Sequence, residues 1–174
     1  MKYSRIVLIS ILAIMPAAYS AQASVALGQS LSRDKALEGL KSCSRSRSAQ
    51  GCNEEASETV IGFYKSGDKA LLKPLLDAGL ISDGALSQSL GSFYADLLHR
   101  EPRTFLTALA SRPKTAQHRL ARLAGSMDGS GMPKEMLGDV KITLSKIAAQ
   151  RSSRLSSVAR LCLAEVSKAN RTAQ

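Results

Sequence analysis

Apolar side chains recur every three or four residues along most of this chain, and that spacing places them on one face of an α-helix. The clearest stretch follows Asp83, where Leu86, Leu90, Phe93 and Leu97 share a helical face behind a residue type that favours the helix N-cap. No stretch alternates apolar and polar residues for long enough to indicate a β-strand. The pattern therefore predicts an all-α fold.

Capping and turn residues divide the pattern into seven or eight short helices. We expect the first helix over residues 25–41, a second one that starts at Asn53, and a last one over residues 152–168. Gly67 is expected to end the second helix, and Asp68 to cap the next one. The short connections favour helices stacked as hairpins, in a solenoid-like array or an irregular bundle.

Prolines mark several of the expected helix starts. Pro102, Pro113 and Pro133 each stand where a new helix should begin, the position at which a missing amide hydrogen is tolerated. Pro74 lies among leucines, so its helix is expected either to start late or to be kinked.

Two segments resemble the paired helices of HEAT and armadillo repeats. "LLKPLLDAG" places a proline among leucines, and "REPRTFLTALA" opens an alanine- and leucine-rich helix with proline and arginine. Phe63-Tyr64 and Phe93-Tyr94 also lie 30 residues apart, which is a suitable period for a helical repeat. The resemblance implies a right-handed stack of helical hairpins. The alternative is an irregular, compact bundle with the same local helices.

The chain begins with the pattern of a bacterial signal peptide. Lys2 and Arg5 precede a mostly apolar run over residues 6–15, and small residues follow up to Ala23. That run would cover only about half of a ~30 Å hydrocarbon core, so a membrane anchor is the weaker interpretation. We expect residues 1–23 to be a signal peptide and the mature protein to be periplasmic or secreted. No cysteine stands at the cleavage site to carry a lipid.

The rest of the chain, residues 24–174, is expected to form a single helical domain that is long enough to bury a core without a metal. Aromatic residues make up 4% of the sequence and tryptophan is absent, so the core should be mainly aliphatic.

Cysteine usage follows from the expected compartment. In oxidising surroundings Cys43 and Cys52 are best interpreted as a disulfide that closes the arginine- and serine-rich loop between them. A zinc site would need four ligands with paired short spacings, and the three cysteines lie far along the chain from His99 and His118. Cys162 falls on an apolar helical stripe, which predicts a buried thiol.

Catalytic patterns are not evident in the sequence. The glycine-rich segment over residues 125–131 has too few carboxylates for a calcium loop and no lysine directly after its glycines for a phosphate loop. We therefore expect no cofactor and no enzyme activity. The alternative is a cell-envelope hydrolase or enzyme accessory protein with a scattered site. A deep cleft with His99 or His118 and acidic neighbours would favour that alternative, and a shallow basic groove would favour binding.

Charge is distributed unevenly between the two halves of the mature chain. Residues 24–99 carry 8 Lys and Arg against 9 Asp and Glu, a net charge of −1. Residues 100–174 carry 14 against 5, a net charge of +9. Such asymmetry indicates an anionic partner, although a basic surface that only keeps the domain soluble is the alternative.

Five arginines are the candidate anion-binding residues. Arg112, Arg119 and Arg122 are expected on one helical face beside an apolar stripe, so their reversal to glutamate should leave the fold intact. Arg151 and Arg154 stand near the start of the last helix, where the helix dipole disfavours cations. We expect these residues to contact an acidic protein or an envelope polyanion, without specific recognition of nucleic acid.

Overall fold

The computed structural model describes residues 31–45, 54–150 and 153–172. These residues contain helices and no strand, so the all-α prediction is confirmed. The helices in chain order are α1 (Arg33–Arg45), α2 (Glu54–Lys65), the 3-10 helix η2 (Lys69–Leu71), α3 (Leu72–Gly79), α4 (Gly84–Arg100), α5 (Pro102–Ala110), α6 (Lys114–Ser126), α7 (Lys134–Ala148) and α8 (Arg154–Thr172).

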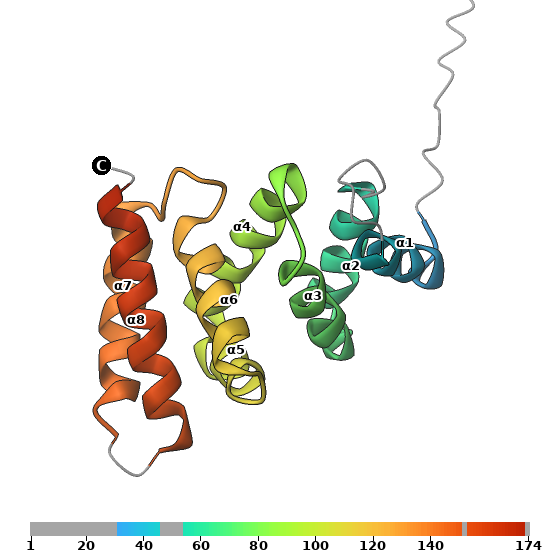
Figure 1. The fold of residues 1–174 in the computed structure, drawn as a ribbon. Helices are drawn as coiled ribbons and strands as arrows, with labels where there is room; N and C mark the ends of the chain where they lie inside the picture. The colour runs from blue at the N-terminus through green and yellow to red at the C-terminus, as the bar shows by residue number, and fades with distance from the viewer. Residues whose placement is uncertain (1–30, 46–53, 151–152, 173–174) are drawn as a thin grey trace, which may run out of the picture.

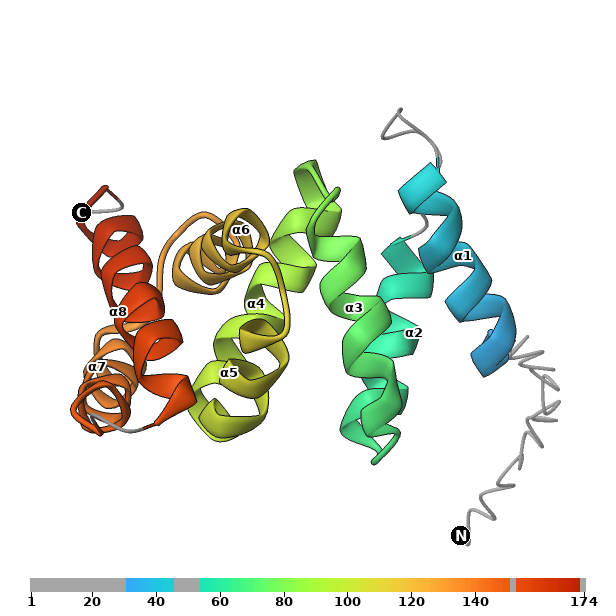
Figure 2. The same cartoon turned by 60° about the horizontal axis from the view of Figure 1, so that its bottom comes forward.

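The helices form an elongated stack that runs from α1 and α2 at one end to α7 and α8 at the other (Figure 1). A second view shows the same order, with α3 and α4 adjacent in the middle of the stack (Figure 2). Helix α6 packs on α4 and on α8, and α8 also packs on α5 and α7. This arrangement agrees with stacked helical hairpins. The likeness to HEAT and armadillo repeats stays a prediction.

The predicted bounds of the first helix are wrong, and Asp68 occupies the predicted N-cap position without a capping hydrogen bond from its side chain. Helix α1 begins at Arg33, where the Ser32 carbonyl accepts the first helical hydrogen bond, from Ala36 N at 2.9 Å. It continues to Arg45, beyond the predicted end at residue 41. The carboxylate of Asp68 does not cap the following helix. It instead accepts a 2.6 Å hydrogen bond from Arg33 Nε, which ties α1 to the α2–η2 turn.

The last helix extends beyond residue 168 because Asn170 is buried and fully engaged. Its side-chain nitrogen donates to the carbonyls of Gly125 and Val166, each at 2.9 Å. Its side-chain oxygen accepts the Met132 amide hydrogen at 2.7 Å. These bonds join the end of α6 and the loop before α7 to the final turns of α8.

The prolines lie at or near helix starts as expected. Helix α3 begins late, after η2, with Pro74 as its third residue, and Pro102 is the first residue of α5. Pro113 and Pro133 stand one residue before α6 and α7, in extended conformations with ψ of 152° and 144°. Since proline disfavours helix in the residue before it, these two prolines separate consecutive helices.

Aromatic side chains form a continuous row through the middle of the core. Tyr64 and Phe93 meet edge to face with ring centroids 5.3 Å apart, and Tyr94 and Phe105 continue the row at 5.6 and 6.0 Å. The hydroxyl of the fully buried Tyr94 donates a 2.6 Å hydrogen bond to the Leu75 carbonyl. The row joins α2, α4 and α5 and places one end of Tyr64 at a surface pocket.

One glycine sets the distance between α4 and the end of α6. A β-carbon on Gly91 would lie 2.1 Å from the Met127 carbonyl oxygen, so only glycine allows this approach. Met127 itself has a positive φ of 49°, which ends α6 sharply before the glycine-rich loop.

Candidate functional site

Two of the five candidate arginines support the fold. Arg112 lies before α6 and not on its face, which corrects the helical-face prediction. Its guanidinium pairs with Asp77 of α3 and donates a 3.2 Å hydrogen bond to the Lys73 carbonyl. Arg119 of α6 donates to the carbonyls of Gly79 and Ser82, at 3.1 and 2.6 Å. Both guanidiniums therefore hold α3 and the turn after it.

The other arginines do not converge on one surface. Arg122 is 63% exposed and pairs with Glu165 of α8 at 3.4 Å. Arg154 is exposed and has no ion-pair partner among the described residues. It lies eleven residues before Glu165, about 16 Å along the helix. Arg151 lies outside the described residues.

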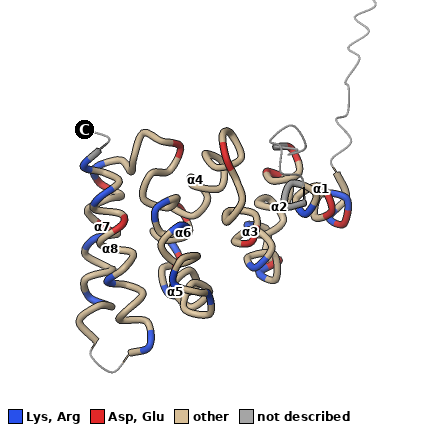
Figure 3. The backbone as a smooth tube through the Cα atoms, viewed as in Figure 1, with Lys and Arg blue, Asp and Glu red and all other residues tan. Residues whose placement is uncertain are grey.

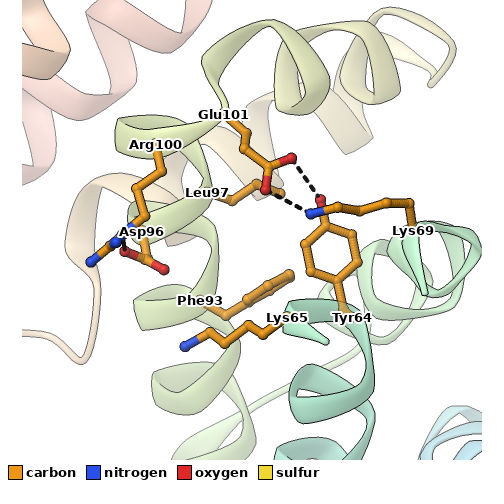
Figure 4. Close-up of a pocket in the computed structure, with 8 residues that line it drawn as sticks. All are labelled: Tyr64, Lys65, Lys69, Phe93, Asp96, Leu97, Arg100 and Glu101. Carbon is orange, nitrogen blue, oxygen red and sulfur yellow. Dashed lines mark hydrogen bonds and ion pairs between the residues drawn. The ribbon is translucent and has the colours of Figure 1, made fainter. Parts of the chain in front are cut away.

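The structure instead gathers cations around the C-terminal end of α4. Lys and Arg dominate the charged residues from this point to α8, as the backbone view shows (Figure 3). Two pockets adjoin here and share Arg100 and Glu101. The first, of about 370 Å³, lies between α2, η2 and α4 (Figure 4). Its lining residues are Tyr64, Lys65, Lys69, Phe93, Asp96, Leu97, Arg100 and Glu101.

Glu101 is the most strongly engaged residue of the first pocket. It accepts a 2.7 Å hydrogen bond from Lys69 Nζ and a 3.3 Å hydrogen bond from the Tyr64 hydroxyl. The Lys69 ammonium also lies 4.2 Å from the centroid of the Tyr64 ring. The hydrogen bond from Lys69 lowers the pKa of Glu101 against the opposing effect of burial. Glu101 is therefore ionised at neutral pH, and Lys69 neutralises it.

The other two cations of this pocket are more available. Arg100 pairs with Asp96 one turn earlier in α4, and its side chain is 74% exposed. Lys65, at the end of α2, has no ion-pair or hydrogen-bond partner among the described residues. Figure 4 shows the Lys65 side chain running past Phe93 on the side of the pocket away from Glu101.

The second pocket is an open groove of about 510 Å³ between the α4–α5 corner and the end of α7. Its lining residues are Arg100, Glu101, Pro102, Arg103, Thr104, Thr143, Lys146, Ile147 and Gln150. Arg103 and Lys146 are exposed on opposite walls, and neither has an ion-pair partner among the described residues. Pro102 and Ile147 give the groove an apolar component.

We call the five cations of the two pockets the cationic band: Lys65, Lys69, Arg100, Arg103 and Lys146. Lys65, Arg100 and Lys146 stand in the last turns of their helices, where the helix dipole favours a cation whatever its function. Arg103 stands in the first turn of α5, where the dipole disfavours it. Sequence reasoning missed the band because its members come from five separate elements. The one sequence signal for the band was Arg103, because a cation in the first turn of a helix is disfavoured by the helix dipole.

The histidines do not belong to this site. His99 lies 3.4 Å from Asp139, and His118 lies 2.8 Å from Glu165. Neither histidine lines the two pockets. Burial tends to raise the pKa of Glu165, but hydrogen bonds from His118 and Arg122 outweigh it and lower the pKa. In the part of the chain that the structure describes, no group of three residues is arranged to hold a metal ion.

Cys162 is a buried, free thiol, as predicted. Burial, with a smaller contribution from the nearby Glu165 carboxylate, raises its pKa to about 12.

The side chain of Cys43 and the whole of Cys52 lie outside the described residues, so their disulfide stays a prediction. The predicted signal peptide, residues 1–23, also lies outside them. Over the described ranges, none of the helices combines the length and apolar character that a membrane span requires.

Comparisons with protein-family models, with curated proteins and with solved structures gave no significant match to this chain.

Proposed function

We propose that this protein is an exported helical binding or scaffold protein without catalytic activity, and that the cationic band contacts an anionic partner. The observation that carries the proposal is the convergence of five cations and only two carboxylates, Asp96 and Glu101, around two adjoining pockets. The proposed location, periplasmic or secreted, rests on the sequence of residues 1–23.

The cations of the band are available to a partner at little cost. Arg100 and Asp96 form an i,i+4 pair on an exposed helix surface, which contributes about 0.3–0.5 kcal/mol and is readily exchanged for another carboxylate. Lys65, Arg103 and Lys146 break no described ion pair when they bind a ligand. Lys69 stays on Glu101 and keeps that carboxylate from repelling an approaching anion.

The proposed binding residues are those of the cationic band and differ from the five arginines that the sequence suggested. Arg112 and Arg119 are engaged within the fold. Arg122 and Arg154 add to the positive charge of the protein but line neither of the two pockets. Candidate partners are an acidic protein surface or an envelope polyanion. Since exposed charges are screened over ~8 Å at physiological salt, binding should weaken steeply as salt rises.

Retention on heparin-agarose tests the proposal with charge-matched variants. The double variant R103E/K146E reverses two cations of the band, and K35E/K134E reverses two exposed lysines outside it. Both variants change the net charge equally. We expect R103E/K146E to elute at clearly lower salt than K35E/K134E, while far-ultraviolet circular dichroism stays unchanged for both. Equal elution of the two variants would mean that the basic half is only a solvated surface.

A further inference from the structure

The groove between the α4–α5 corner and α7 has the size of a short peptide segment. Its α7 wall runs from Thr143 to Gln150, about 10 Å along a helix axis. An extended chain covers that distance in about three residues. The groove volume of about 510 Å³ lies within the usual range of ligand pockets.

The walls of the groove offer apolar and cationic contacts side by side. Pro102 is partly exposed and contributes most of the apolar surface, since Ile147 also lines the groove but is only 5% exposed. Arg103 and Lys146 face the groove from opposite walls. A ligand that uses the whole groove must therefore carry both apolar groups and negative charges.

A peptide with alternating acidic and apolar residues meets this requirement. In an extended chain successive side chains point to opposite faces, so apolar side chains can pack on Pro102 while carboxylates reach Arg103 and Lys146. The guanidinium of Arg103 suits a carboxylate, because it can donate two parallel hydrogen bonds to it. Thr104, Thr143 and Gln150 add side-chain groups that can hydrogen-bond a peptide backbone.

Other anions fit the groove less well. A polyphosphate carries a charge at every unit and has no apolar group, so it gains nothing from the apolar part of the groove lining. The surface of an anionic bilayer is flat, whereas this site lies between two walls. Charge complementarity together with apolar surface therefore favours a protein segment.

We propose that this groove binds an extended acidic segment of a partner protein, in which carboxylates contact Arg103 and Lys146 and an apolar side chain packs on Pro102 beside Ile147. The inference rests on the proposed function, because it names the class of anionic partner that the cationic band recognises.

Fluorescence anisotropy with two labelled peptides of equal charge tests this inference on the mature protein. The peptides are acetyl-Glu-Leu-Glu-Leu-Glu and acetyl-Glu-Gly-Glu-Gly-Glu. We expect the leucine peptide to bind at least ten-fold more tightly, and R103E/K146E to lose at least ten-fold while K35E/K134E loses less than three-fold. Inorganic polyphosphate and phosphatidylglycerol vesicles, used as competitors at equal charge concentration, should displace the leucine peptide poorly.

A groove-filling variant separates docking in the groove from attraction to the surface. Thr143→Arg adds a positive charge but places a long side chain in the groove, so it should weaken binding of the leucine peptide. Tighter binding by T143R, or more effective displacement by either competitor, would overturn the inference. If both peptides bind alike and only R103E/K146E weakens them, the proposed function survives and this inference fails. If no reversal affects binding, both fail.

Discussion

Arg112 is predicted to be a structural residue whose loss destabilises the fold. The variant Arg112→Met keeps most of the side-chain length but removes the guanidinium that joins the start of α6 to α3. In the native structure this side chain is 15% exposed, pairs with Asp77 and donates to the Lys73 carbonyl. The partly exposed Asp77 would lose its contact with Arg112.

The expected cost follows from these contacts. A hydrogen bond to a charged partner contributes about 1.5–3 kcal/mol and a neutral carbonyl bond about 0.5–1.5 kcal/mol. Because Asp77 is 45% exposed and keeps a second partner in Lys73, solvent and that lysine reduce the loss. We expect a decrease of about 2 kcal/mol in the free energy of unfolding, which corresponds to roughly 4–8 °C in Tm for a chain of this size.

Urea denaturation followed by far-ultraviolet circular dichroism measures this change. The matched control is Arg122→Met, in which a 63% exposed arginine pairs across to α8 and should contribute less than about 1 kcal/mol. The reasoning would be refuted if R112M and R122M unfolded at the same urea concentration. It would equally be refuted if reversal of Arg112 to glutamate left stability unchanged, as the sequence pattern alone predicts.

Three further predictions test the packing, the thiol and the pocket. Gly91→Ala should lower the free energy of unfolding by more than about 2 kcal/mol, because the added methyl group overpacks against Met127. Gly138→Ala has nothing within 4 Å of the added carbon and should stabilise α7 by about 0.5–1 kcal/mol. Equal urea midpoints for the two variants would contradict the close approach of Gly91 to Met127. Cys162 should resist iodoacetamide in the native state at pH 8, because its pKa of about 12 leaves little thiolate, and alkylation at the rate of the urea-unfolded protein would show that it is accessible. Folding lowers the pKa of Glu101, so the contacts of its carboxylate stabilise the protein at neutral pH, and this contribution is lost as pH falls through the folded pKa. The difference in stability between wild type and E101Q should therefore shrink below pH 4.5. A constant difference would contradict the contact with Lys69.

Local sequence signals accounted for the helices but not for their exact ends. Helical spacing of apolar residues and the prolines at helix starts are short-range features, and the structure agrees with both. The ends of α1 depend on more than spacing, since apolar residues before residue 31 continue the same pattern. Asp68 has the residue type of a helix cap, but Arg33, 35 residues away, takes its carboxylate. A local pattern contains no information about such a competitor.

Only the positive charge of the candidate site, and not its position, could be predicted from the sequence. The excess of cations after residue 100 is visible in the sequence, and the second pocket lies in this half. The first pocket is lined mainly by residues before position 100, and its Lys65 and Lys69 belong to the half with a net charge of −1. Which cations stay available depends on tertiary contacts. Arg119 is exposed, as a helical wheel indicates, but its guanidinium also donates hydrogen bonds to the carbonyl groups of Gly79 and Ser82, which the wheel cannot show. Lys65 and Lys146 are far apart in sequence, and they line adjoining pockets only because α2 and α7 both contact α4.

Residue-resolved mapping of an anionic probe on the folded protein shows whether the cationic band is the surface that binds anions. Amide NMR spectra of isotope-labelled mature protein would be recorded during titration with poly-L-glutamate at low salt. The account predicts that the largest shifts fall at the ends of α2, α4 and α7 and at the start of α5, around the cationic band. Shifts spread evenly over all exposed lysines and arginines, or centred on Arg122 and Arg154, would contradict it.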